Sequence, residues 1–396
     1  KFSQETLVLG ELWEGLAAYA PIKPPALVAV DASIEAPWQP LNRPARILSF
    51  LGSLLTVLLY STGAGVLNDR LIADPDLLAS RAIAPVSAAL LGIELVHQAS
   101  HLVVAKNRGV EWSTPGVPLP SLPTGLLGVV NRVKQHPRTR QDMFDTALVG
   151  PCAGLVASLF CLGLGAALGG ATASSSELLA QEMPQLPADL IRGSVLASLF
   201  YAAANDAAIP PHTLVSADPL FVAGLAGIIS NACQTLPLGQ TDGGRATTAS
   251  LGKLLGGAII DVFKYSVSIV ALITGNSLVM LYVFYVVSLQ NSEEISCQDD
   301  VTAPSSSSRK AHAACLAIAF FALIPLPGDL LCGNQQQMQQ QQSISMGTES
   351  FASRQPFATS TTSAAANSAE TTFATSPTPP GSSGSSLLPA GFPEIM

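Results

Sequence analysis

Long runs of apolar residues alternate with polar, proline-rich connections along this chain. A helix needs about 20 mostly apolar residues to cross a bilayer. We expect such spans at Ile47–Leu67, Ala82–Ala105, Phe144–Leu168, Leu190–Ile209, Pro219–Leu238, Ala258–Gln290 and Ala311–Leu331. The stretch 258–290 exceeds one span, and Gly275-Asn276 near its middle predicts two spans or a tight hairpin. The pattern predicts an all-α polytopic membrane protein with about seven transmembrane helices.

The segments outside these runs divide the chain into three regions. Residues 1–45 are mixed and contain several prolines, which indicates a peripheral N-terminal segment. Residues 46–332 would form the transmembrane core. Residues 333–396 open with a Gln-rich run and continue in Ser, Thr, Ala, Pro and Gly, a composition typical of a disordered tail. The connection Lys106–Gln141 holds five prolines and is expected to be irregular.

Composition supports the membrane class. Only 12% of residues are Asp, Glu, Lys or Arg, against about 25% in soluble domains, and mean hydropathy is +0.41. We therefore expect membrane lipid as the surrounding partner. The net charge of −8 argues against a nucleic-acid partner. Six cysteines show no Cys-x-x-Cys spacing, so we expect small buried apolar residues rather than a redox motif.

Two histidines stand four residues apart inside the second expected span. His97 and His101 would share one helix face, so both imidazoles could reach one metal ion. Ionisable side chains at membrane depth are costly and usually functional. Spacing alone leaves an alternative open, in which the pair are core histidines bonded to neighbouring helices.

A carboxylate follows the fifth span in the segment Leu236–Arg245, which reads LPLGQTDGGR. Asp242 there could return into the membrane on a broken helix. Two His and one Asp would leave a fourth zinc position open, as catalytic sites require. Taken alone, the segment is also compatible with a simple Asp-Gly-Gly turn.

The order of these motifs resembles that of site-2 proteases, which are intramembrane zinc metalloproteases. His-x-x-x-His comes first, the segment Gly150–Gly154 (GPCAG) second, and LPxGxxDGGR last. The resemblance covers about residues 45–330 and implies a peptidase-like core. It is nearest to the plastid branch, the ethylene-dependent gravitropism-deficient and yellow-green proteins. The segments similar to that branch are Asn107–Glu111, Gly128–Asn131, Asp218–Leu220 and Glu293–Ile295.

This resemblance implies roles for individual residues. His97, His101 and Asp242 would be the ligands of a zinc ion. The family's general base is the Glu after the first His, and that position is Gln98 here. Gln cannot take up a proton near neutral pH, and loss of a general base costs about 10²–10⁴-fold in rate. The resemblance thus implies a homologue whose proteolysis is weak or lost.

The segment beside Asp242 implies substrate-positioning residues. Gln234 replaces the Asn that family members commonly carry three residues before the proline, and Gly243 and Gly244 follow the ligand. The expected partner is a transmembrane protein substrate or client, and the expected location is a plastid membrane. Two alternatives stay open: an active membrane metalloendopeptidase that cleaves transmembrane substrates, and a non-enzymatic membrane scaffold or transporter.

Overall fold

A computed structural model describes residues 43–113, 116–205, 209–290 and 295–325. The expected peripheral segment 1–45 lies almost wholly outside the described residues, and the expected tail 333–396 lies entirely outside them. The three-region division of the chain therefore remains a prediction. The arrangement below concerns only the described part, which belongs to one compact unit.

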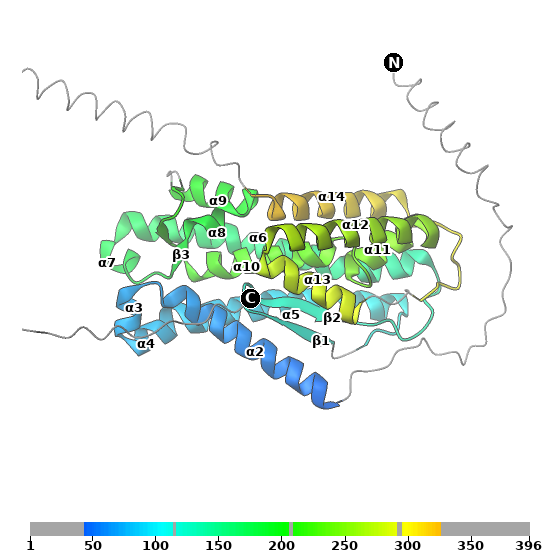
Figure 1. The fold of residues 1–396 in the computed structure, drawn as a ribbon, viewed down its shortest axis with the longest axis horizontal. Helices are drawn as coiled ribbons and strands as arrows, with labels where there is room; N and C mark the ends of the chain where they lie inside the picture. Colours follow the sequence, from blue (N-terminus) through cyan, green and yellow to red (C-terminus); the bar gives the residue numbers. More distant parts are fainter. Residues whose placement is uncertain (1–42, 114–115, 206–208, 291–294, 326–396) are drawn as a thin grey trace, which may run out of the picture. The chain divides into compact units, whose positions relative to one another are not determined.

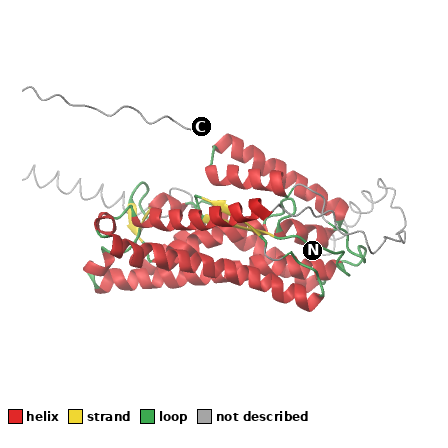
Figure 2. Ribbon diagram, turned by 90° about the horizontal axis from the view of Figure 1, so that it is seen from below, coloured by secondary structure: helices red, strands yellow, loops and turns green. Residues whose placement is uncertain are grey.

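Helices make up most of the described chain (Figures 1 and 2). In chain order they are α2 (Arg43–Gly65), α3 (Asp69–Ala73), α4 (Pro75–Leu78), the π-helical turn η1 (Ala79–Ile83), α5 (Ala84–Arg108), α6 (Arg140–Ser175), α7 (Glu177–Ala180), α8 (Ala188–Arg192), α9 (Val195–Asn205), α10 (Pro219–Thr235), α11 (Asp242–Leu251), α12 (Lys253–Thr274), α13 (Ser277–Leu289) and α14 (Ser306–Leu323). The mainly helical membrane architecture expected from the sequence is confirmed.

Four helical stretches of the described chain are long and apolar enough to cross a membrane: Arg43–Gly65, Pro75–Arg108, Arg140–Ser175 and Lys253–Thr274. Large apolar side chains on these helices point outward, and Leu48 and Ile273 are 72% and 80% exposed. A soluble monomer rarely exposes apolar surface on this scale. These helices are therefore suited to contact with lipid.

The other expected spans correspond to shorter helices. α9 has 11 residues, α13 has 13, α10 has 17 and α14 has 18. At about 1.5 Å per residue they reach roughly 16–27 Å, against about 30 Å for a bilayer core. The predicted stretch 258–290 is indeed broken, because Gly275 adopts a φ of 61° and ends α12. A count of about seven spans remains a prediction.

Helix α6 packs against α5, α9, α10 and α11. Its contact with α10 is a close approach of two backbones. A Cβ built on Gly165 would lie 2.1 Å from the backbone nitrogen of Phe221. Because real Cβ contacts are never this short, only glycine allows the two helices to pack at that distance. α6 therefore fixes the position of α10, which precedes the segment that carries Asp242.

The connection between α5 and α6 contains a β-hairpin. Strand β1 (Val117–Ser121) pairs antiparallel with β2 (Gly125–Val130), and the hairpin packs against α2 (Figure 1). A second antiparallel pair joins β3 (Gln185–Pro187) to β4 (Leu214–Ser216). The prediction of an all-α chain is corrected by these two sheets. The expectation of an irregular connection is corrected by the hairpin, since proline excludes a helix interior but is accepted in an edge strand.

Side chains from two helices satisfy the backbone of this hairpin. Thr56 Oγ1 on α2 donates to Gly125 O at 2.6 Å, and Tyr285 OH on α13 donates to Pro120 O at 2.8 Å. Ser49 on α2 donates to Pro118 O. An exposed strand edge would leave these carbonyls without partners. The hairpin is therefore held between α2 and α13.

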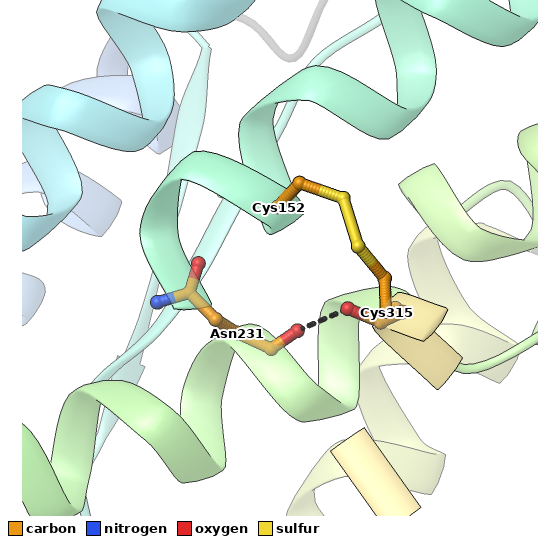
Figure 3. Close-up of a disulfide and its surroundings, with 4 residues drawn as sticks. Cys152, Asn231 and Cys315 are labelled. Carbon is orange, nitrogen blue, oxygen red and sulfur yellow. Dashed lines mark hydrogen bonds between the residues drawn. A yellow bond between two sulfur atoms is a disulfide. The ribbon is translucent and has the colours of Figure 1, made fainter. Parts of the chain in front are cut away.

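A disulfide joins Cys152 on α6 to Cys315 on α14, 163 residues apart (Figure 3). The expectation that the cysteines are merely small apolar residues is wrong for this pair. Spacing along the chain could not reveal the pair, because only the packing of α14 against α6 brings the two sulfurs together. Among the described residues, Cys161, Cys233 and Cys297 form no disulfide.

Candidate metal centre

Three side chains from two distant parts of the chain converge at one buried point. His97 Nε2 and His101 Nε2 lie 3.1 Å apart, and Asp242 Oδ2 lies 3.3 Å from the first and 3.1 Å from the second. Their exposed fractions are 1%, 0% and 4%. The three residues expected to act as metal ligands are therefore brought together. No other group of three or more potential ligands was found among the described residues.

The geometry of this cluster fits a tetrahedral zinc ion. Ligand atoms about 2.0–2.1 Å from zinc lie about 3.3 Å from one another in a tetrahedron. The three separations seen here are 3.1–3.3 Å. Three protein ligands also leave one tetrahedral position open, which is typical of catalytic rather than structural zinc sites.

The outer nitrogens of both imidazoles support the same reading. His101 Nδ1 lies 2.7 Å from Thr146 O on α6. His97 Nδ1 lies 2.6 Å from Asn231 Oδ1 on α10. A carbonyl oxygen only accepts, so each neutral imidazole carries its proton on Nδ1. Both Nε2 lone pairs then face the Asp242 carboxylate. Such a convergence of acceptors calls for a cation between them.

Glycine at two positions of α6 makes room for this arrangement. A Cβ built on Gly150 would lie 2.1 Å from His101 Nε2, and one on Gly154 would lie 1.9 Å from Asn231 Oδ1. The helix backbone itself therefore forms the wall behind the two side chains. The GPCAG segment noted in the sequence thus packs directly against His101 and against Asn231, the partner of His97.

Asp242 reaches the cluster as the first residue of α11. Thr241 caps this helix, and its Oγ1 accepts from Gly244 N at 3.1 Å. A Cβ on Gly243 would lie 1.9 Å from Thr235 O. The tight return of the chain from α10 into α11 therefore requires glycine there. The Asp-Gly-Gly segment therefore forms a turn, which is one of the two alternatives that the sequence left open. The same turn places the Asp242 carboxylate beside His97 and His101.

A buried arginine stands behind the carboxylate. Arg245 NH1 lies 3.6 Å from Asp242 Oδ1, and its NH2 donates to Asn131 O at 2.7 Å. The guanidinium carbon lies 5.3 Å from the centre of the Trp112 ring, which in turn stacks on His101 at 5.0 Å. This cation orients the second oxygen of the carboxylate. Sequence reasoning missed its role, although it belongs to the DGGR motif.

Gln98, at the position of the expected general base, is hydrogen-bonded at both ends of its amide. Its Nε2 donates to Glu94 Oε1 at 2.9 Å, and its Oε1 accepts from Asn131 Nδ2 at 2.7 Å. Both bonds hold the amide in one orientation. Neither Gln98 nor Asn131 provides a site that accepts a proton at neutral pH.

Gln234, expected to position substrate, does not bond to the three ligands. It is buried, and its Nε2 donates to Leu127 O in β2 at 3.0 Å. The amide next to the metal ligands is instead that of Asn231, one turn earlier on α10. Roles for Gln234, Gly243 and Gly244 in substrate contact remain predictions.

Known proteins are similar in sequence to part of this chain. It is 29% identical over 253 residues to the probable zinc metalloprotease EGY1, chloroplastic, of Oryza sativa subsp. japonica, which is 62% of this chain and 41% of that protein. The Arabidopsis thaliana EGY1 gives 29% over 249 residues, 62% and 43% of the two chains. The chain is thus similar to the plant EGY proteins, which are named as probable chloroplast zinc metalloproteases. The rice EGY3 (subsp. indica) matches less closely, at 25% over 292 residues, 72% and 48% of the two chains.

This similarity confirms the resemblance to the plastid zinc metalloproteases that the sequence motifs indicate. The chain spans less than half the length of these EGY relatives. No family model matches it, and no solved structure matches it significantly. The relatives' names support zinc as the metal, and the His97, His101 and Asp242 cluster could hold such an ion.

Proposed function

We propose that this chain is a zinc-binding intramembrane metalloprotease homologue of a plastid membrane, whose proteolysis is weak or lost. The observation that carries the proposal is the convergence of His97, His101 and Asp242 within tetrahedral ligand distances. His97 and His101 are buried on a helix long enough to cross a bilayer, which favours action on membrane-embedded protein. We propose about seven spans, with α9, α10, α13 and α14 joining the four long helices.

The ligand set would hold zinc, and the surrounding residues would keep it in place. Zinc supplies a Lewis acid that polarises a carbonyl and acidifies water. His97 and His101 are oriented by their Nδ1 bonds, and Arg245 steadies the carboxylate of Asp242. Binding and orienting a peptide carbonyl would therefore be retained.

Proton transfer is the part of the chemistry that this chain lacks. A general base must sit within about 2.6–3.2 Å of the proton it removes and must accept that proton. Gln98 occupies the base position but accepts no proton, and its amide is held by Glu94 and Asn131. We therefore expect client binding with a turnover about 10²–10⁴-fold below that of a Glu variant.

The test compares wild type, Gln98→Glu and His97→Ala, each reconstituted in lipid with a helical membrane substrate. We expect Gln98→Glu to cleave and wild type to cleave at least about 100-fold more slowly. His97→Ala should lose both zinc and cleavage. Equal cleavage by wild type and Gln98→Glu would show an active endopeptidase. A purified wild type with no zinc at all would contradict the proposed metal centre.

A further inference from the structure

A cavity of about 540 Å³ lies beside Gln98, between α2, α5 and the β-hairpin. Most of its wall is apolar and includes Phe50 and Leu54 of α2 and Leu91 of α5. Binding pockets commonly have volumes of about 300–1,000 Å³, with a few polar groups in an apolar wall. The position of this cavity, next to the residue that follows the first zinc ligand, makes it the place where a bound segment would meet the centre.

The cavity has four polar lining residues, which are Ser53, Glu94, Gln98 and Asn131. Glu94 contributes a carboxylate, one oxygen of which accepts from Gln98. Asn131 Oδ1 and Ser53 Oγ are buried and have no hydrogen-bond partner among the described residues. These two residues are only 2% and 4% exposed, so bulk water does not satisfy them. Among the lining residues, Glu94 is the one that carries a formal charge.

Glu94 also lacks a basic partner. Within the part of the chain that the structure describes, no Lys or Arg side chain forms an ion pair with it. Acidic side chains on helices that lie in a bilayer are costly unless a cation compensates them. An apolar wall ending in a carboxylate matches a lysine or arginine, whose aliphatic stem packs on apolar surface while its charged end seeks acceptors.

We propose that this cavity binds a lysine or arginine side chain of a client transmembrane segment, with Glu94 as the residue that selects it. The proposal rests on the client binding proposed above and adds the chemical class of the client. The other polar residues of the wall, Ser53, Gln98 and Asn131, lie around the end of the bound side chain. The cavity is larger than one basic side chain, so it also admits neighbouring residues of the client, whose peptide groups face the amide of Gln98.

The test measures binding of two labelled transmembrane peptides to the purified full chain in phosphatidylcholine nanodiscs. The peptides have the same Leu-Ala sequence and differ at one central position, which is lysine in one and norleucine in the other. We expect wild type to bind the lysine peptide at least about 10-fold more tightly, or about 1.4 kcal/mol. Equal affinities would overturn the proposal, and this comparison needs no variant.

Two variants assign the preference to a residue. Glu94→Gln keeps the acceptor for Gln98 and should bind both peptides alike, whereas Glu177→Gln, on the exposed α7, should keep the wild-type preference. A preference that survives in Glu94→Gln would overturn the assignment. If the wild-type preference for the lysine peptide disappears when phosphatidylethanolamine is added, the occupant is a lipid amine and the client assignment is overturned. The zinc content of the same samples is measured separately from peptide binding. A wild type that prefers the lysine peptide but contains no zinc would contradict only the proposed function.

Discussion

Replacement of Asn231 by alanine probes how the metal centre is supported. The Asn231 side chain holds His97 through its Oδ1 and is itself held by Nδ2 bonds to Gly227 O at 2.9 Å and Ser158 Oγ at 3.4 Å. Alanine removes the only partner of His97 Nδ1 found in the described chain. The imidazole then loses both its preferred orientation and the bond that fixes its tautomer.

The expected magnitude follows from this loss. Removing an outer partner of a metal-bound histidine typically weakens metal affinity by about 10–100-fold, which corresponds to about 1.4–2.7 kcal/mol. Gly227 O retains its helical bond within α10, so the fold itself should lose little. We therefore expect Asn231→Ala to release zinc at a lower chelator concentration while its thermal unfolding changes by only a few degrees.

The assay is competition for zinc against a chromophoric chelator, with the protein in detergent micelles. Asn231→Asp keeps the acceptor oxygen and should bind zinc within about threefold of wild type. Asn205→Ala is a matched control, because among the described residues the Asn205 side chain bonds only to Tyr201 O in its own helix. Zinc affinity of Asn231→Ala equal to that of wild type would refute the view that this amide positions His97.

Three further substitutions test other parts of the structure. Gly150→Ala places a Cβ 2.1 Å from His101 Nε2 and should weaken zinc binding at least about 10-fold, whereas Gly92→Ala, with nothing within 4 Å, should not; equal losses would contradict the packing argument. Cys315→Ser opens the disulfide to α6 and should lower the free energy of unfolding by about 2–4 kcal/mol, read as a lower midpoint of thermal unfolding; an unchanged midpoint would show that the link contributes nothing. Arg245→Met leaves a buried carboxylate without its cation and should cost about 3–5 kcal/mol of stability; thermal unfolding of the zinc-free protein equal to wild type would argue against this.

The sequence predicted the parts of the site that depend on local geometry. Four-residue spacing places two side chains on the same face of any helix, so the pairing of His97 and His101 followed from their positions alone. The break at Gly275 followed from the conformational freedom of glycine. Asp242 was found by the order of motifs in a family, since nothing local to it indicates which distant helix it meets.

The choice between Asn231 and Gln234 could not be made from the sequence. The two residues lie three apart on α10, and the rotation of that helix against its neighbours decides which amide reaches His97. Gln234 is engaged by Leu127 in β2, a strand that the prolines of the connection concealed. The expectation for Gln234 thus differs from the structure because the strand that it bonds to was not predicted. The disulfide was missed for a related reason, because helix packing alone creates it.

The disulfide between α6 and α14 bears on the side from which a membrane segment could reach the site. Cys152 shares one helical turn with the two glycines that back His101 and Asn231. The disulfide therefore ties α14 to the part of α6 that packs against His101 and Asn231. The opposite flank, where α2 and the hairpin border the cavity beside Gln98, carries no such tether among the described residues. We therefore expect a segment from the lipid to approach from the side of α2 and the hairpin rather than past α14.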